Sequence, residues 1–420
     1  MAVISAPISS TSIMRGRGGW RDLDWFMLLL VMALSLWGCL TILSATRPTD
    51  SAMSAQPVAG ATTTVDKRGT GSKATGSARA GNKARSPMRG IPDGMKQAIW
   101  IVIGLTLLAL VALSDYQWLM HLQFWIYISY LGLLAAVLVL PSHFAPIING
   151  AKSWIHFGPF VLQPAEFGKF AVLVTLAAFL CRRQERIREF STVVWSFLYL
   201  TPAILLILKQ PDFGTTLAIL SIWFGMLFFG GARLRHLALV LLAGATLFGL
   251  AWKTGKLKQH QKERLAVFLN TDTDSRGAAY QVNQSQIAIG SGQITGQGWG
   301  KGMQNRAGYV PEKSTDFIFA VVAEELGFVG AATLILAYLF LLFRSATIAM
   351  TNENYFGALI AGGFTTLLAF HTIINLGMTM RVMPITGVPL PFFSYGGSSY
   401  VAFSLSIGLL QSIATRRWRN

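Results

Sequence analysis

The chain has 420 residues, of which 53% are hydrophobic and 13% are charged, and its mean hydropathy is +0.50. This composition excludes a soluble domain of that length and is typical of an integral membrane protein. The formal net charge of +17 would favour a nucleic-acid partner in a soluble protein. Here the basic residues flank apolar runs or lie in loops, so topology and contact with anionic membrane lipid explain them, and we expect no nucleic-acid partner.

Apolar runs of about 20 residues recur along the chain, which is the length that crosses about 30 Å of hydrocarbon at about 1.5 Å per residue. They predict an all-α, polytopic membrane protein with about ten transmembrane helices. These helices are expected near residues 24–45, 97–116, 119–140, 164–181, 191–208, 212–231, 234–252, 317–343, 355–378 and 397–414. The first run is too long for a signal-peptide core, so we expect a cytoplasmic tail at 1–23 and a membrane domain at 24–420.

The positions of Lys and Arg predict the topology, because short cytoplasmic loops carry an excess of both. With the N-terminus inside, the short outer loops contain only Lys152, Lys209 and Arg381. The cytoplasmic segments then contain Arg15, Arg17, Arg21, Arg182, Arg183, Arg186, Arg188, Arg233, Arg235, Arg344, Arg416, Arg417 and Arg419. An even number of helices leaves both termini in the cytoplasm.

Two segments interrupt the helix pattern. Residues 46–96 are rich in Ala, Gly, Ser, Thr and Lys and contain almost no large apolar residue, which predicts a disordered insertion on the outer side. Residues 253–316, between helices seven and eight, contain aromatic residues and many glycines, which favours a folded functional loop on the outer side.

The glycine-rich part of this loop, GSGQITGQGWGKG (290–302), does not match a phosphate-binding motif. In the P-loop spacing, Thr295 stands at the position of the first glycine and Gly302 follows Lys301 in place of Ser or Thr. No predicted strand and helix flank it. We therefore do not expect a nucleotide site.

Five stretches carry a resemblance that covers most of the chain outside the insertion. They are QPAEFGKFA (163–171), KQPDFGTTL (209–217), GAAYQVNQSQIAIGSG (277–292), TDFIFAVVAEELGFVG (315–330) and GVPLPFFSYGGSS (387–399). In this order they resemble the SEDS family (shape, elongation, division and sporulation). The stretch PITGVPLPFFSYGG is closer to the elongation branch than to the division branch, which stays open as the alternative.

The resemblance implies a peptidoglycan glycosyltransferase in the bacterial cytoplasmic membrane. Such an enzyme polymerises lipid II into β-1,4 glycan strands on the outer surface and releases undecaprenyl pyrophosphate. Its implied partners are lipid II, the nascent glycan strand, a class B penicillin-binding protein and other membrane proteins of the elongation complex.

The implied reaction needs one base. A sugar 4-hydroxyl attacks an anomeric carbon whose leaving group is a pyrophosphate, which departs without protonation, unlike the alkoxide in glycoside hydrolysis. One general base, inverting geometry and positive charge near the phosphates should suffice. A divalent cation such as Mg²⁺ or Mn²⁺ could supply that charge, but the sequence shows no clustered ligand set, so the cofactor stays open.

Asp316 is the expected base, because it lies at the outer edge of helix eight, where a lipid-linked sugar would lie. The alternative is that Ser314, Thr315 or Asp316 caps this helix. Members of the family commonly have His two residues before this Asp, whereas this chain has Ser314. Glu324 and Glu325 lie about two turns further along, too far to act on the same atom, and we expect them to bond neighbouring helices.

Seven further residues are candidates for substrate binding. Glu166 and Lys169 form either an ordinary ion pair after Pro164 or, with Trp154, the lining of a cavity in which Lys169 binds pyrophosphate. Asp212 is most simply a helix cap, with Lys209 extending to the interface, although both could face substrate. LPFFSYGGSS predicts either a re-entrant turn whose N–H groups bind an anion or a loop kept small for packing, in which Ser398 is a helix cap. Arg381, just before it, is expected near the pyrophosphate. The full set is Trp154, Glu166, Lys169, Lys209, Asp212, Arg381 and Ser398.

Two other functions stay open. A lipid II flippase would also need charged residues in an apolar bundle and basic groups for pyrophosphate. A non-catalytic scaffold of the wall-synthesis complex is the third interpretation. Catalysis requires its best carboxylate at the outer face, where Asp316 is expected, whereas transport requires charges near mid-membrane, where Glu324 and Glu325 are expected.

Overall fold

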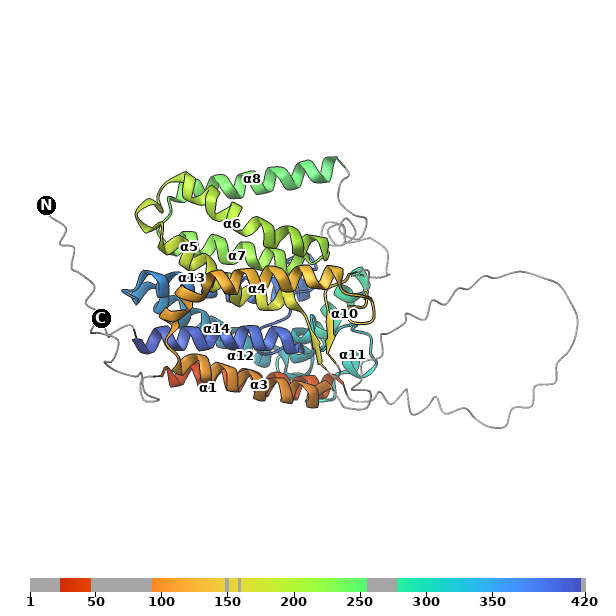
Figure 1. Cartoon of the computed structure of the whole chain (residues 1–420). Helices are drawn as coiled ribbons and strands as arrows, with labels where there is room; N and C mark the ends of the chain where they lie inside the picture. Colours follow the sequence, from red (N-terminus) through yellow and green to blue (C-terminus); the bar gives the residue numbers. More distant parts are fainter. Residues whose placement is uncertain (1–22, 47–92, 148–150, 158–159, 255–277, 417–420) are drawn as a thin grey trace, which may run out of the picture.

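The computed structural model describes residues 23–46, 93–147, 151–157, 160–254 and 278–416 (Figure 1). The tail expected at 1–23 and the insertion expected at 46–96 fall almost entirely outside the described residues. The helices are α1 (Trp25–Ala45), α3 (Asp93–Leu113), α4 (Leu119–Val139), α5 (Pro164–Cys181), α6 (Phe190–Lys209), α7 (Phe213–Phe229), α8 (Leu234–Lys253), α10 (Ala278–Ser291), α11 (Met303–Arg306), α12 (Ile318–Thr351), α13 (Tyr355–Thr379) and α14 (Gly397–Arg416). Two short 3-10 turns occur at Tyr116–Trp118 and Gln184–Arg186.

The all-α membrane fold is confirmed. Each of the ten apolar runs forms a helix in the described part of the chain, and the bounds agree with the predicted ones to within a few residues except at the extended end of α12. Seven of the described helices are long and apolar enough to cross a membrane. The apolar parts of α7 and α8 are shorter than those of these seven helices. The count of ten membrane spans therefore stays a prediction.

α14 lies inside the bundle, packed on α3 and α5, and α13 packs on α7 and α12 (Figure 1). Nearly every residue of α14 is buried, and the helix contains several serines. An internal helix tolerates such residues because small side chains allow close approach and their hydroxyls bond neighbouring helices. One example is Ser412 Oγ, which donates to the carbonyl of Ser114 at 2.6 Å.

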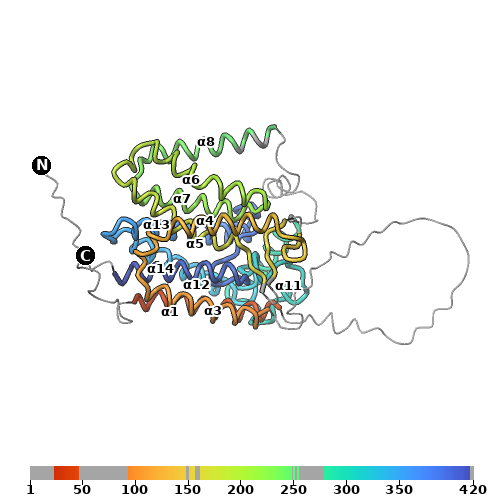
Figure 2. The backbone as a smooth tube through the Cα atoms, viewed as in Figure 1, coloured from red at the N-terminus to blue at the C-terminus, as the bar shows by residue number. Residues whose placement is uncertain are grey.

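A short antiparallel hairpin, β1 (Ile155–Phe157) and β2 (Phe160–Leu162), precedes α5, and Ile155 pairs with Leu162. This hairpin and α11 lie at the same end of the bundle (Figures 1 and 2). α10 and α11 fall within the segment expected as a folded outer loop, of which 255–277 lie outside the described residues. α8 lies at one edge of the bundle, packs on α7 and is largely exposed along its described length.

α12 is interrupted at Gly327, where the backbone adopts φ 65° and ψ −160°. Glycine adopts this left-handed conformation without steric cost. An unbroken helix of 34 residues would be about 51 Å long, well beyond the hydrocarbon core. The break separates a short first piece, which carries Glu324 and Glu325, from a long second piece.

The glycine-rich loop 292–298 fills the break in α12. Its contacts are backbone bonds of 2.8–3.2 Å, from Gln297 to Glu324, Gly298 to Glu325, Phe328 to Gln293 and Val329 to Ile294. A Cβ placed on Gly292 or Gly296 would lie 1.8 or 2.2 Å from a carbonyl oxygen of α12. These glycines allow two backbones to touch, which satisfies the polar groups that the break leaves open.

Candidate active site

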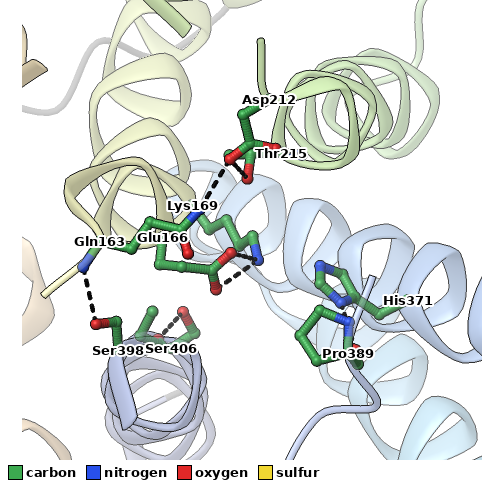
Figure 3. Close-up of polar contacts among 10 residues, drawn as sticks. Gln163, Glu166, Lys169, Asp212, Thr215, His371, Pro389, Ser398 and Ser406 are labelled. Atoms are coloured by element: carbon green, nitrogen blue, oxygen red, sulfur yellow. Dashed lines mark hydrogen bonds and ion pairs between the residues drawn. The ribbon is translucent and has the colours of Figure 1, made fainter. Parts of the chain in front are cut away.

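A buried ion pair joins the first two turns of α5, which begins with Pro164 one residue after the hairpin. Lys169 Nζ is 2.8 Å from both carboxylate oxygens of Glu166 (Figure 3). Lys169 is 1% exposed and Glu166 is 6% exposed. Of the two interpretations left open by the sequence, the ion pair is present, and in this conformation the ammonium group is buried and already bound.

Phe403 and His371 complete the surroundings of Lys169. Lys169 Nζ lies 5.4 Å from the ring centroid of Phe403, and the imidazole of His371 packs against the same ring at 4.9 Å. His371 Nδ1 is 3.0 Å from the carbonyl of Pro389 (Figure 3). A carbonyl only accepts, so Nδ1 carries the proton, and Nε2 has no hydrogen-bond partner among the described residues.

Asp212 caps α7, as the simpler interpretation of the sequence predicts. Its carboxylate accepts from the Thr215 amide at 3.0 Å and from the Thr215 hydroxyl at 2.8 Å. It also accepts from Gln163 Nε2 at 2.9 Å. The backbone N–H of Gln163 donates to Ser398 Oγ at 3.0 Å (Figure 3). Gln163 therefore joins the ends of α7 and α14 at the start of α5.

Asp316 lies in the turn that precedes α12 and is half-buried. The N-cap position of α12 is Phe317, and no side chain caps the helix from that position. Asp316 Oδ2 is 3.5 Å from the position that a Cβ on Gly387 would occupy. The carboxylate therefore lies against the loop that follows α13.

This loop, residues 385–396, lies against both Asp316 and the first turn of α7, which Asp212 caps. A Cβ on Gly214, in the first turn of α7, would lie 3.4 Å from the Thr386 carbonyl and 3.8 Å from Asp212 Oδ1. Asp316 lies against the adjacent residue, Gly387. Residues of α7, α12, α13 and α14 thus contact one segment, residues 385–396, which we call the 385–396 loop.

Five backbone amides of the 385–396 loop donate hydrogen bonds within the protein. Leu390 N–H donates to Ser394 Oγ, and Gly396 N–H donates to Gln97 Oε1. The amides of Phe393, Ser394 and Tyr395 donate to backbone carbonyls. In this conformation these five N–H groups are not available to an anion, and the anion site expected at this turn stays a prediction. Three of these bonds stay within the loop, whereas those of Tyr395 and Gly396 reach the Ser314 carbonyl and the Gln97 side chain.

The other three candidates are Trp154, Lys209 and Arg381. Trp154 is half-buried and directly precedes β1, and Lys209 is exposed at the last position of α6. Arg381 follows α13 in a left-handed conformation, φ 60°. Its Nη1 lies 3.2 Å from Asn283 Oδ1 of α10. Arg381 therefore connects the end of α13 to α10.

Glu324 and Glu325 bind neighbouring segments. The carboxylate of Glu324 accepts from the amides of Gln304 and Asn305, at 2.6 and 3.1 Å, at the start of α11. Glu325 accepts from Ser44 Oγ of α1 at 2.6 Å and from Asn305 Nδ2 at 2.9 Å. Together the two glutamates hold α11 and α1 against α12.

Lys313 also binds α11, since its Nζ donates to the carbonyl of Asn305 at 2.6 Å. Burial lowers the pKa of Lys313, while the charges of Glu324 and Glu325 raise it. Within the described ranges, no group of three or more His, Cys, Asp or Glu side chains could hold a metal ion.

Three residues of this centre were not predicted from the sequence: Gln163, His371 and Asn375, whose Nδ2 donates to the carbonyls of Asp316 and Val388. A signal exists for two of them, because His371 and Asn375 are spaced i, i+4 within an apolar helix and share one of its faces. Polar residues in such a helix usually face the bundle interior. Gln163 gives no comparable signal, since its role depends on where α7 and α14 end.

Comparison with known proteins identifies the family. The profile of the FtsW/RodA/SpoVE family, described as cell cycle protein, matches residues 83–418. The peptidoglycan glycosyltransferase MrdB of Escherichia coli K12 is 36% identical over 281 residues, which are 67% of this chain and 75% of MrdB. The stage V sporulation protein E of Bacillus subtilis is 34% identical over 304 residues, 70% of this chain and 82% of the relative.

Solved structures support the same family assignment. A chain from a peptidoglycan synthase complex that coordinates polymerization and crosslinking is 29% identical, with a TM-score of 0.71 and coverage of 96% of this chain and 100% of that chain. The rod shape determining protein RodA of Thermus thermophilus is 26% identical, with a TM-score of 0.62 and coverage of 96% and 99%. The chain therefore belongs to the FtsW/RodA/SpoVE family, which is the SEDS family that its motifs resemble.

Proposed function

We propose that the protein is a peptidoglycan glycosyltransferase of cell elongation, which polymerises lipid II into β-1,4 glycan strands and releases undecaprenyl pyrophosphate. The observation that carries this proposal is the position of Asp316, a half-buried carboxylate outside the N-cap position of α12 and directly against the 385–396 loop. The names of the E. coli and T. thermophilus relatives support the reaction class and the elongation branch.

Asp316 acts as the general base. The 4-hydroxyl of the acceptor sugar transfers its proton to a carboxylate oxygen of Asp316 as the hydroxyl oxygen attacks the anomeric carbon of the donor. The bond from that carbon to the pyrophosphate oxygen breaks, and the pyrophosphate carries away the electron pair. Attack from the face opposite the leaving group inverts the anomeric carbon.

Positive charge near the pyrophosphate stabilises its departure. Lys209 and Arg381 are the accessible candidates in our scheme, because Lys209 is exposed and Arg381 is half-buried. Lys169 could bind a phosphate oxygen only if its ion pair with Glu166 broke. In our scheme the intact ion pair therefore has a structural role, which is to hold α5 in place. A divalent cation such as Mg²⁺ or Mn²⁺ would supply further positive charge at the pyrophosphate if the reaction requires one, and the described residues offer it no cluster of three or more His, Cys, Asp or Glu side chains.

The proposed setting is the cytoplasmic membrane, with both termini inside and Asp316 at the outer face. Its proposed partner is a class B penicillin-binding protein, together with other membrane proteins of the elongation complex. The relation to a synthase complex that coordinates polymerization and crosslinking supports such a partner. Trp154, Asp212 and Ser398 surround the sugar and phosphate groups in this proposal, with the Gln163 contacts fixing the last two.

A lipid II flippase is the second candidate. The buried row of Glu166, Lys169 and His371 favours it, since ionisable residues inside a membrane bundle often mark a pathway. The two functions differ in product, because a transporter makes no new glycosidic bond.

Purified protein should be incubated with lipid II, with and without its penicillin-binding partner, and scored for glycan strands. In parallel, vesicles that contain the protein should be scored for movement of lipid II between leaflets. Strands without transport support the polymerase. Transport with no strand under any condition replaces it with the flippase.

A further inference from the structure

We propose that Asn375 and Ser394 are positioning residues that fix the Asp316 carboxylate by binding the backbone of its turn. Neither residue touches the reacting atoms in this scheme. The inference rests on the proposed function, since it takes Asp316 as the base.

Three consecutive carbonyls of the Asp316 turn accept hydrogen bonds from α13 and the 385–396 loop. The Ser314 carbonyl accepts from the Tyr395 amide at 2.8 Å, and the Thr315 carbonyl accepts from Ser394 Oγ at 2.6 Å. The Asp316 carbonyl accepts from Asn375 Nδ2 at 3.0 Å. Because each peptide unit is planar, fixing three carbonyls in a row fixes the direction in which the Asp316 side chain leaves the backbone.

The two side chains that donate these bonds, Asn375 and Ser394, are themselves fixed by further hydrogen bonds. Asn375 is fully buried, and its Nδ2 also donates to the Val388 carbonyl at 2.8 Å, so both of its N–H bonds are used. Ser394 is 5% exposed, and its Oγ also accepts from the Leu390 amide at 2.9 Å. The same two side chains therefore fix the 385–396 loop and attach the Asp316 turn to it.

The loop conformation is held by more than these bonds. Phe392 has φ 64°, a left-handed conformation that costs a non-glycine residue free energy and persists only where the surroundings enforce it. Its ring packs at 5.8 Å from Tyr400 and at 5.9 Å from Phe403 of α14. The conformation of the 385–396 loop is therefore fixed by its own contacts, and Gly387 of this loop lies directly against the Asp316 carboxylate.

A positioning role follows from the geometry of proton transfer. A general base must lie within hydrogen-bond reach of the proton that it removes. A displacement of about 1 Å can reduce a rate about 100-fold. The clamp formed by Asn375 and Ser394 removes the main freedom of the base, the rotation of the turn before α12.

Ser394→Ala and Asn375→Leu each remove one side of the clamp. We expect the kcat of lipid II polymerisation to fall about 10- to 100-fold while KM changes less than about twofold, because the displaced group is the base and not a substrate contact. Ser394→Thr keeps the hydroxyl and should recover most of the rate. The control is Thr372→Ala on the same helix, which removes a hydroxyl bonded to the Leu368 carbonyl and should keep kcat within about twofold.

The decisive measurement repeats Ser394→Ala in an Asp316→Asn background. If Ser394 acts through Asp316, the residual rate should fall no further than about twofold, because the two changes remove the same contribution. The proposal is overturned by a parental kcat in both clamp variants, by an equal fold-loss in the two backgrounds, or by loss of the folded state in both variants. If the Asp316→Asn protein is fully active, the assignment of Asp316 as the base is wrong. If Asp316→Asn is inactive while Ser394→Ala and Asn375→Leu are fully active, only the positioning role of Asn375 and Ser394 is wrong.

Discussion

A carboxylate that removes a proton and one that only accepts hydrogen bonds respond differently to the change from Asp to Asn. Asp316→Asn should leave the protein folded and able to bind lipid II, but should reduce polymerisation by about 10²–10⁴. Glu325→Gln is the matched control, since Gln keeps an oxygen for the Ser44 and Asn305 donors. Strand formation and lipid II binding should be measured for both. Near-parental polymerisation by Asp316→Asn would show that another group is the base.

A second prediction for individual residues concerns the Glu166–Lys169 ion pair. Lys169→Met leaves a carboxylate buried without its partner, which should reduce the free energy of unfolding by about 3–5 kcal/mol. Lys169→Met combined with Glu166→Gln should recover most of that loss, because no buried charge remains. Thermal unfolding in detergent tests both. If the double variant is stable but makes no strand, the pair has a direct role in the reaction, contrary to the structural role assigned here.

At the scale of elements, the loop 292–298 and the broken helix α12 depend on each other. Gly296 has φ 81°, and a Cβ there would lie 2.2 Å from the Glu325 carbonyl. Gly296→Ala should therefore displace the loop and lower stability by about 1–3 kcal/mol, through steric overlap and lost backbone bonds. Gly290→Ala is the control, because nothing lies within 4 Å of its added Cβ. Equal melting temperatures for the two variants would contradict this account.

The same elements show what the sequence can predict. Helix positions follow from apolar length alone, which is why the expected helix at 164–181 matches α5 at both ends. The break at Gly327 leaves no such signal, since apolar residues continue on both sides of it. The pairing of Asp316 with Asn375 depends on the path of the 385–396 loop, and a path of that kind is fixed by tertiary contacts rather than by local pattern. For this reason Asp316 was predicted, but the residues that hold it were not.

At the scale of the whole molecule, α1 is bonded to α12 near both of its ends. Ser44 binds Glu325 at one end. At the other end, Asp24 caps α1 and forms an ion pair with Arg344, while its backbone exchanges two hydrogen bonds with Gln411 of α14. The second attachment lies far along α12 from the Asp316 turn, so it should serve stability and not catalysis.

Asp24→Ala tests this separation. It removes a cap and a partly exposed ion pair, so the free energy of unfolding should fall by about 1–3 kcal/mol. Asp115→Ala is the matched control, because Asp115 caps the 3-10 turn at Tyr116–Trp118 through the Gln117 amide at an exposed position, and its loss should cost less. The kcat of Asp24→Ala should stay within about twofold of the parent, since the Asp316 turn is held by α13 and the 385–396 loop. A tenfold loss of kcat with an unchanged melting temperature would instead mean that α12 transmits changes along its length, across the break at Gly327.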